Sequence, residues 1–115
     1  MTQYVDAYNR VWGDGDITNS IDIPASMNLL TFEVADGTTY TVGIPAGTYG
    51  FNGVVRRADL VDEFNRQLES SGVPIKCYVG GVRGENKRYN CMVFQSKSDQ
   101  KIVSITGSFL PHFED

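Results

Sequence analysis

Three aspartates stand close together in the stretch DGDITNSID, and they are the residues of this chain best suited to holding a metal ion. They are Asp14, Asp16 and Asp22. Calcium sites use closely spaced oxygen ligands, and an EF-hand loop also needs glycine at its sixth position and glutamate at its twelfth. Asn19 and Ala25 occupy those positions here. The sequence therefore favours a solvated turn over a calcium site.

Thiol chemistry depends on two cysteines, Cys77 and Cys91. A hairpin centred on Gly84 would place them directly opposite each other, where a close, non-hydrogen-bonded pair could form a cross-strand disulfide. Because both fall among apolar residues and no export signal is present, reduced core residues are the favoured interpretation. The only histidine, His112, lies in the C-terminal tail. One histidine makes no metal site, and no Cys–His pair for nucleophilic catalysis is indicated.

A basic cluster at the tip of the same hairpin could contact an anionic ligand, such as a phosphate or a glycan. It consists of Arg83, Lys87 and Arg88. The adjacent glycine-rich stretch, Gly80–Gly84, precedes no helix and so lacks the context of a phosphate-binding loop. The net charge of −4 makes nucleic acid an unlikely partner. A charged tip that keeps the hairpin soluble is the favoured interpretation.

No triad, paired acids or metal-ligand set can be assembled from the remaining residues, so we expect no enzyme, no cofactor and no small-molecule substrate. The 115 residues, 41% hydrophobic and 21% charged, are typical of one globular domain. No apolar run approaches the roughly 18 residues that span a bilayer. The N-terminus carries no secretory signal. We therefore expect synthesis in the cytoplasm and no membrane partner.

The elements that position these residues begin with a predicted hairpin. Leu30–Val34 and Tyr40–Ile44 alternate in hydropathy around a DG turn. A turn centred on Gly37 would pair Phe32 with Val42 and place the apolar side chains on one face of a sheet.

Further strands are predicted along the chain. Ile75–Val79 and Tyr89–Gln95 form a second predicted hairpin, and Ile102–Ile105 a last strand. Ile21–Ala25 is a predicted short edge strand, since Pro24 would interrupt a central ladder.

The strongest helical pattern covers Arg57–Glu69. Its apolar stripe consists of Leu60, Val61, Phe64 and Leu68. The helix should end before Gly72, and its start could reach back to Gly53 with Asn52 as its cap. The order of elements predicts an α+β fold, in which two antiparallel hairpins and a further strand form a sheet with one helix packed across it.

Both ends of the chain carry large apolar side chains outside this module. Helical spacing predicts a short helix from Thr2 to about Trp12. Aromatic anchors dominate many interface energies, so the ends could dock on partners. They could equally fold back on their own sheet, and domain swapping would reconcile both. The candidate partner-binding residues are Tyr4, Val5, Tyr8, Trp12, Phe109, Leu110 and Phe113.

These elements divide the chain into three segments. Residues 1–28 form a predicted docking arm and loop, residues 29–107 the α+β module, and residues 108–115 a C-terminal tail. Nothing in the composition indicates a linker between separate domains.

The central segment resembles a known type of module. Three stretches carry the likeness: TFEVADGTTYTVGIPAGTYG, ADLVDEFNRQL and VFQSKSDQKIVSITG. They are similar to the insertion module of flagellins and hook-associated proteins, with its DG-turn hairpin, I-x-x-G-T-Y corner and L-V-x-x-x-N-x-x-L helix. Structural proteins of phages and large DNA viruses contain similar segments. The matching positions are Ile44, Gly47, Thr48, Tyr49, Leu60, Val61, Asn65 and Leu68.

The resemblance implies a structural role. Flagellar modules sit inside long chains with coiled-coil ends, whereas this sequence has no heptads and a longer link between corner and helix. We therefore expect a minor capsid, decoration or tail-associated subunit of a virion, which contacts copies of itself and other structural proteins. The alternatives are a flagellar or hook-associated domain on an extracellular bacterial appendage, and a small phosphate- or glycan-binding module.

Overall fold

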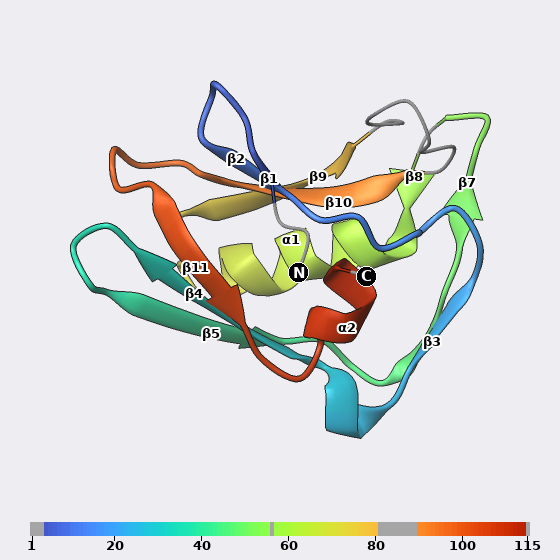
Figure 1. Cartoon of the computed structure of the whole chain (residues 1–115). Helices are drawn as coiled ribbons and strands as arrows, with labels where there is room; N and C mark the ends of the chain where they lie inside the picture. The colour runs from blue at the N-terminus through green and yellow to red at the C-terminus, as the bar shows by residue number, and fades with distance from the viewer. Residues whose placement is uncertain (1–3, 56, 81–89, 115) are drawn as a thin grey trace.

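The computed structural model describes residues 4–55, 57–80 and 90–114. The fold is α+β, as the sequence predicts (Figure 1). Its helices are α1 (Asp59–Ser70), the short α2 (Leu110–Phe113) and a 3-10 turn, η1 (Ala25–Met27). Its strands are β1 (Tyr4–Val5), β2 (Arg10–Trp12), β3 (Ile21–Ile23), β4 (Leu29–Val34), β5 (Thr39–Gly43), β6 (Gly47–Tyr49), β7 (Phe51–Asn52), β8 (Arg57–Ala58), β9 (Ile75–Gly80), β10 (Cys91–Ser96) and β11 (Ile102–Thr106).

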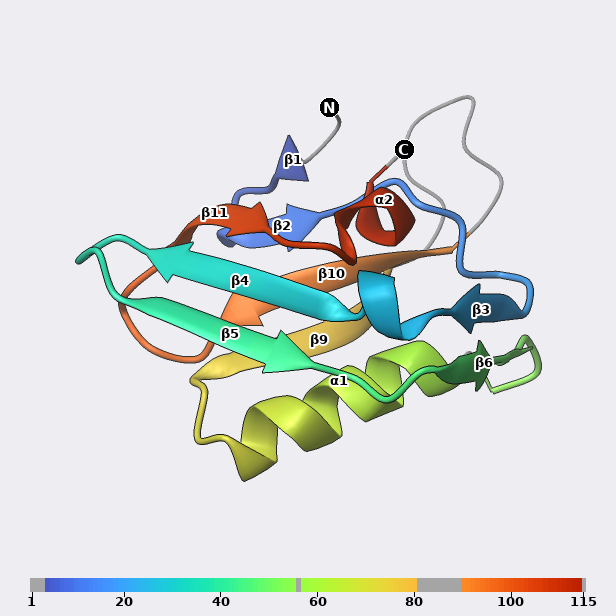
Figure 2. The same ribbon diagram turned by 90° about the horizontal axis from the view of Figure 1, so that it is seen from below.

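The strands form two main antiparallel sheets. One has the order β1-β2-β10-β9 and the other the order β11-β4-β5. The two predicted hairpins therefore lie in different sheets, and not in one. Figures 1 and 2 show the sheets on either side of a core, with both helices between them. The predicted edge strand is β3, which pairs with β6 of the I-x-x-G-T-Y corner.

The β4–β5 hairpin is displaced by two residues from its predicted register. Phe32 lies opposite Tyr40, and Leu30 lies opposite Val42. The reason is a tighter turn, in which Gly37 adopts φ +91° and donates to the carbonyl of Val34. This geometry matches a three-residue hairpin loop with glycine in the left-handed position. An even displacement keeps each side chain on its predicted face, so Leu30, Phe32 and Val42 are buried.

The β9–β10 hairpin is displaced by three residues, and here the predicted pairing is wrong. Phe94 lies opposite Cys77, and Gly80 lies opposite Cys91. The odd displacement puts the two cysteines on opposite faces of the sheet. The cause is that Cys91–Phe94 is a continuous apolar run that is buried throughout. Such a run has no alternation from which a face could be predicted.

The predicted N-terminal helix is also wrong, because residues 4–12 form the β1–β2 hairpin. Val5 pairs with Val11, and β2 continues the sheet by pairing with β10. The turn is closed at Asn9, which has φ +60°. Asparagine tolerates this left-handed conformation better than most residues, and the turn brings two β-prone segments together.

The predicted main helix is confirmed as α1, although it begins at Asp59 with Ala58 before it, and not near Gly53. Its apolar stripe is buried, and Glu63 on its other side is also buried. Gly72 has φ +69°, and the amides of Gly72 and Val73 donate to the carbonyls of Glu69 and Leu68. This is a Schellman motif, which satisfies the last carbonyls of the helix.

Asn65 attaches α1 to the edge of the four-stranded sheet. Its amide nitrogen donates to the carbonyl of Cys77 at 2.9 Å, and its amide oxygen accepts from the Cys77 N–H at 2.8 Å. The side chain thus pairs with β9 as a neighbouring strand would. It occupies backbone groups that an edge strand leaves open to other chains.

The C-terminal tail folds back into the core. Phe109 and Phe113 are 0% exposed, and Leu110 packs partly buried against them. The ring centroids of Phe109 and Phe64 lie 4.9 Å apart, and those of Phe113 and Phe94 lie 5.3 Å apart. Residues of all three predicted segments share this core, which also includes Val11 and Ile17.

The loop that follows β2 is not a solvated turn. Gly13 donates to the carbonyl of Met92 in β10, and Gly15 donates to that of Phe113 in α2. A Cβ atom on Gly13 would lie 2.1 Å from the Phe113 carbonyl oxygen, so only glycine permits this approach. The stretch lies between β10 and α2, and Asp14 within it is 4% exposed.

We expect Phe109→Ala to lower the free energy of unfolding by about 3–5 kcal/mol, because it leaves a cavity against Phe64. Urea denaturation of the full chain measures this, and the milder Phe109→Leu should give a smaller loss. Pro111→Ala, at an exposed neighbouring position, is the control. Unchanged stability in Phe109→Ala would contradict a core role for the tail.

Candidate functional site

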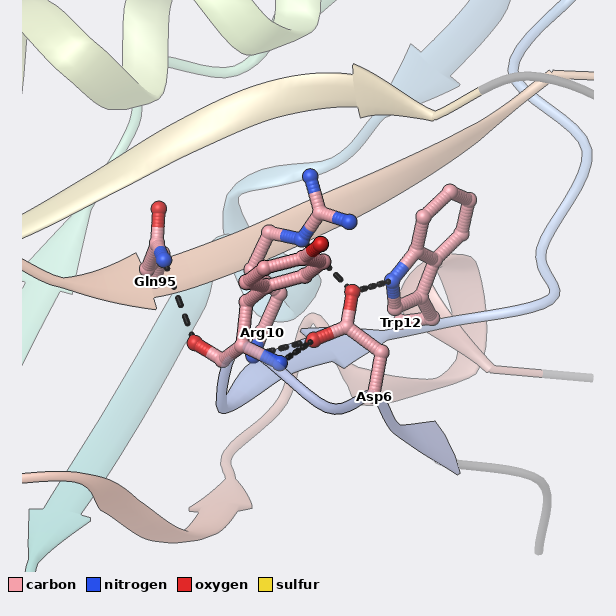
Figure 3. A network of polar contacts seen from close by, with 5 residues as sticks. Asp6, Arg10, Trp12 and Gln95 are labelled. Atoms are coloured by element: carbon pink, nitrogen blue, oxygen red, sulfur yellow. Dashed lines mark hydrogen bonds and ion pairs between the residues drawn. The ribbon is translucent and has the colours of Figure 1, made fainter.

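The exposed face of the β1–β2 hairpin is the candidate site, and it is built around the carboxylate of Asp6. One carboxylate oxygen, Oδ1, accepts the backbone N–H groups of Tyr8 and Arg10 at 2.9 and 3.0 Å. The other, Oδ2, accepts Arg10 Nε at 2.6 Å and Trp12 Nε1 at 2.9 Å. Figure 3 shows these side chains converging on Asp6. One carboxylate therefore fixes both the turn and the two large side chains that follow it.

The electrostatics of Asp6 follow from this geometry. Burial raises the pKa of the carboxyl group, but the hydrogen bonds from Trp12, Arg10 and Tyr8 outweigh it and lower that pKa from 3.8 to about 2. The side chain of Asp6 is 11% exposed, against 37% for Arg10. The ionised form is thus the one that the hairpin requires.

Arg10 lies against two aromatic rings. Its guanidinium carbon lies 5.1 Å from the centroid of Tyr8 and 5.8 Å from that of Trp12. Both distances are within the range of a cation–π contact. Gln95 of β10 adds a bond from its amide to the carbonyl of Tyr8 at 3.2 Å, which ties the turn to the sheet (Figure 3).

Among the predicted partner-binding residues, the structure separates the two ends of the chain. Val5 is 53% exposed and Tyr8 is 70% exposed. Trp12 is partly buried, because its ring covers Gly80 on the outer face of the sheet. The side chain of Tyr4 lies outside the described part of the structure. The tail residues Phe109 and Phe113 fill the core and present no anchor to a partner, and Leu110 is only partly exposed.

Sequence reasoning missed Asp6 and Arg10. Both were hidden by the helical interpretation of residues 2–12, which treats polar residues between apolar ones as a wet face. A signal was present, since aspartate at the start of a turn commonly accepts the N–H two residues later.

The candidate metal ligands do not converge. Asp16 accepts the Thr18 N–H, and Asp22 accepts the hydroxyl of Thr48. Asp14 is buried, which corrects its assignment to a solvated turn. Within residues 4–55, 57–80 and 90–114, no group of three His, Cys, Asp or Glu side chains is placed to hold a metal. In the same ranges, no helix is long and apolar enough to cross a membrane.

The remaining candidates have plain placements. His112 is partly buried, and its ring lies against Phe109 at 5.5 Å between centroids, so it is not a surface residue. The possible anion contacts Arg83, Lys87 and Arg88 lie outside the described residues. Cys77 and Cys91 are free thiols, both buried. Burial raises the pKa of Cys77 well above its ordinary value.

In comparisons with known proteins, no family model, no curated protein and no solved structure matches this chain.

We expect Asp6→Asn to lower the free energy of unfolding by about 1 kcal/mol at pH 7, since partial exposure screens the network. The folded-state pKa is depressed, so this contribution is present above about pH 4 and disappears as the pH falls towards about 2. Urea denaturation at several pH values tests this. Asp16→Asn, which alters a turn with one printed hydrogen bond, is the control. A difference between wild type and Asp6→Asn that did not shrink in acid would contradict the assignment.

We also expect neither thiol to react with 5,5′-dithiobis(2-nitrobenzoic acid) in the native protein, and both to react in denaturant. Burial limits access to both thiols, and the raised pKa of Cys77 keeps its thiolate scarce. Mild oxidation should give no intramolecular disulfide, because the two side chains leave the sheet on opposite faces. Rapid labelling of the folded chain, or a disulfide found by mass spectrometry, would contradict this.

Proposed function

We propose that this chain is a non-enzymatic structural protein of a virus or phage particle and acts through protein–protein contacts. The observation that carries the proposal is the exposed Tyr8 ring beside Arg10, on a hairpin that Asp6 fixes. Tyrosine, tryptophan and arginine are the residues that most often dominate binding energy at protein interfaces. Here all three lie within one short hairpin.

The rigidity of this hairpin supports the proposal. Binding costs free energy when side chains must be ordered, and a surface that is already ordered avoids much of that cost. Asp6 holds the backbone of Tyr8 and Arg10 and the side chains of Arg10 and Trp12 before any partner arrives. Val5, 53% exposed on β1, extends the apolar surface to the edge of the sheet.

The particle setting is supported by the sequence resemblance in residues 30–107. The strands and helix named by that resemblance are present, with Thr48 and Tyr49 in β6 and Asn65 bonded to β9. In this setting, the module acts by shape and the β1–β2 hairpin docks on another copy or on a neighbouring structural protein.

Light scattering of the full-length chain over a concentration series tests the contact surface. We expect discrete oligomers, and we expect Tyr8→Ser to weaken association at least about tenfold, because it removes an aromatic anchor. Val5→Thr should weaken it less. Val103→Thr is the matched control, since Val103 on β11 has nearly the same exposure as Val5, 52% against 53%.

Two results would contradict the proposal. A strict monomer at every concentration would remove self-association, and equal effects of Val5→Thr and Val103→Thr would remove the β1–β2 hairpin as its site. The setting is tested separately, by antibody detection of the chain in purified particles from the producing culture. Detection only outside particles would contradict the structural role.

A further inference from the structure

A hollow of about 220 Å³ lies beside the β1–β2 turn, at the end of the four-stranded sheet. The β1–β2 turn contributes Tyr8 and Asn9 to its lining. Gln95 lines it from β10, and the turn between β10 and β11 supplies Ser98, Asp99 and Lys101. Its volume is below the roughly 300–1,000 Å³ of sites for drug-sized ligands, so it suits one small ring or a similar group.

Both walls of the hollow are held by hydrogen bonds of their own. The Asp6 network fixes the first wall, and Gln95 ties that wall to β10. In the second wall, Ser98 donates its N–H to Ser96 Oγ at 3.2 Å, and its own hydroxyl accepts the Gln100 N–H at 3.1 Å. The hollow is therefore formed before a ligand arrives, as is usual for small-molecule sites.

Asn9 has an unusual backbone for its position. Its φ of +60° is the only positive value at a non-glycine residue in the described ranges. Glycine would adopt this conformation at lower cost, whereas asparagine adds an amide at the rim of the hollow. The residue thus combines a turn conformation with a group that can both donate and accept hydrogen bonds.

Three polar side chains of the lining have no partner in the part of the chain that the structure describes. The carboxylate of Asp99, the ammonium of Lys101 and the amide of Asn9 make no hydrogen bond or ion pair there. One charge of each sign lines the same small space, so the hollow does not favour a net charge on its ligand. It offers donors and acceptors to a neutral group that carries several hydroxyls.

Tyr8 adds an aromatic surface to this polar lining. Its side chain is 70% exposed, with the guanidinium of Arg10 at 5.1 Å from the ring centroid. A pyranose ring has an apolar C–H face and a rim of hydroxyls. The C–H face suits the negative face of an aromatic ring, and the hydroxyls suit amide, carboxylate and ammonium groups.

We infer that this hollow binds one neutral sugar ring of hexose size, stacked on Tyr8 and hydrogen-bonded to Asn9, Asp99 and Lys101. This site lies apart from Arg83, Lys87 and Arg88 in sequence, and it does not depend on the proposed assembly role. The few contacts available to a single ring correspond to a dissociation constant of about 1 mM.

The test uses the full-length chain and methyl glycosides of glucose, galactose, mannose and N-acetylglucosamine, each at millimolar concentration. We expect saturation-transfer NMR to show contact with ring protons of at least one glycoside. Amide shifts in ¹⁵N spectra of the protein should then centre on residues 8–9 and 98–101. Inorganic phosphate at the same concentration should leave these amides unmoved.

Four variants locate the site. Tyr8→Ala and Asp99→Ala should each weaken binding at least tenfold. Asn9→Gly should weaken it while keeping the turn, because glycine accepts the same φ. Tyr78→Ala is the control, since Tyr78 is an exposed tyrosine, 38% accessible, on β9, and binding should be unchanged.

Several results would overturn the inference. These are no saturation transfer from any glycoside, shifts at residues 8–9 and 98–101 caused by phosphate alone, and equal losses in Tyr78→Ala and Tyr8→Ala. Asp99→Ala leaves the β1–β2 hairpin intact, so it should lose sugar binding and keep the oligomers seen by light scattering. Failure of the assembly proposal would therefore appear separately from failure of the sugar site.

Discussion

The packing of aromatic rings around Phe94 is the interaction on which the rest of the fold depends. Phe94 in β10 contacts Phe32 of the other sheet at 4.9 Å between centroids, Phe64 of α1 at 5.8 Å and Phe113 of α2 at 5.3 Å. Two sheets and two helices thus meet at one side chain that is 0% exposed. Because aromatic pairs contribute beyond their buried area, this cluster fixes how the layers sit together.

This packing also determines what remains at the surface. Phe109 and Phe113 close the core beside α1, and the tail then covers Gly13 and Gly15. The β1–β2 hairpin is left outside this core, where Asp6 supplies the order that packing does not. A carboxylate with four hydrogen bonds can hold a turn at the surface with little buried apolar area. The exposed Tyr8 is a consequence of that arrangement.

Several local features were predictable because their causes are local. The stripe of α1 and its end at Gly72 follow from helical spacing and from the left-handed preference of glycine. The β4–β5 hairpin follows from alternation and a DG turn. At the candidate site, only Val5, Tyr8 and Trp12 could be selected, as aromatic or apolar residues near one end. Asp6 could not, because its role depends on the hairpin.

The sequence by itself determined the α+β class, the main helix and most strands, since propensity and periodicity act over a few residues. Tertiary structure alone decided the register of β9–β10, because Cys91–Phe94 is apolar throughout and both faces of that strand are covered. It also turned residues 4–12 into a hairpin and put the tail in the core. In each case a short segment had two acceptable conformations, and burial against distant residues selected one of them.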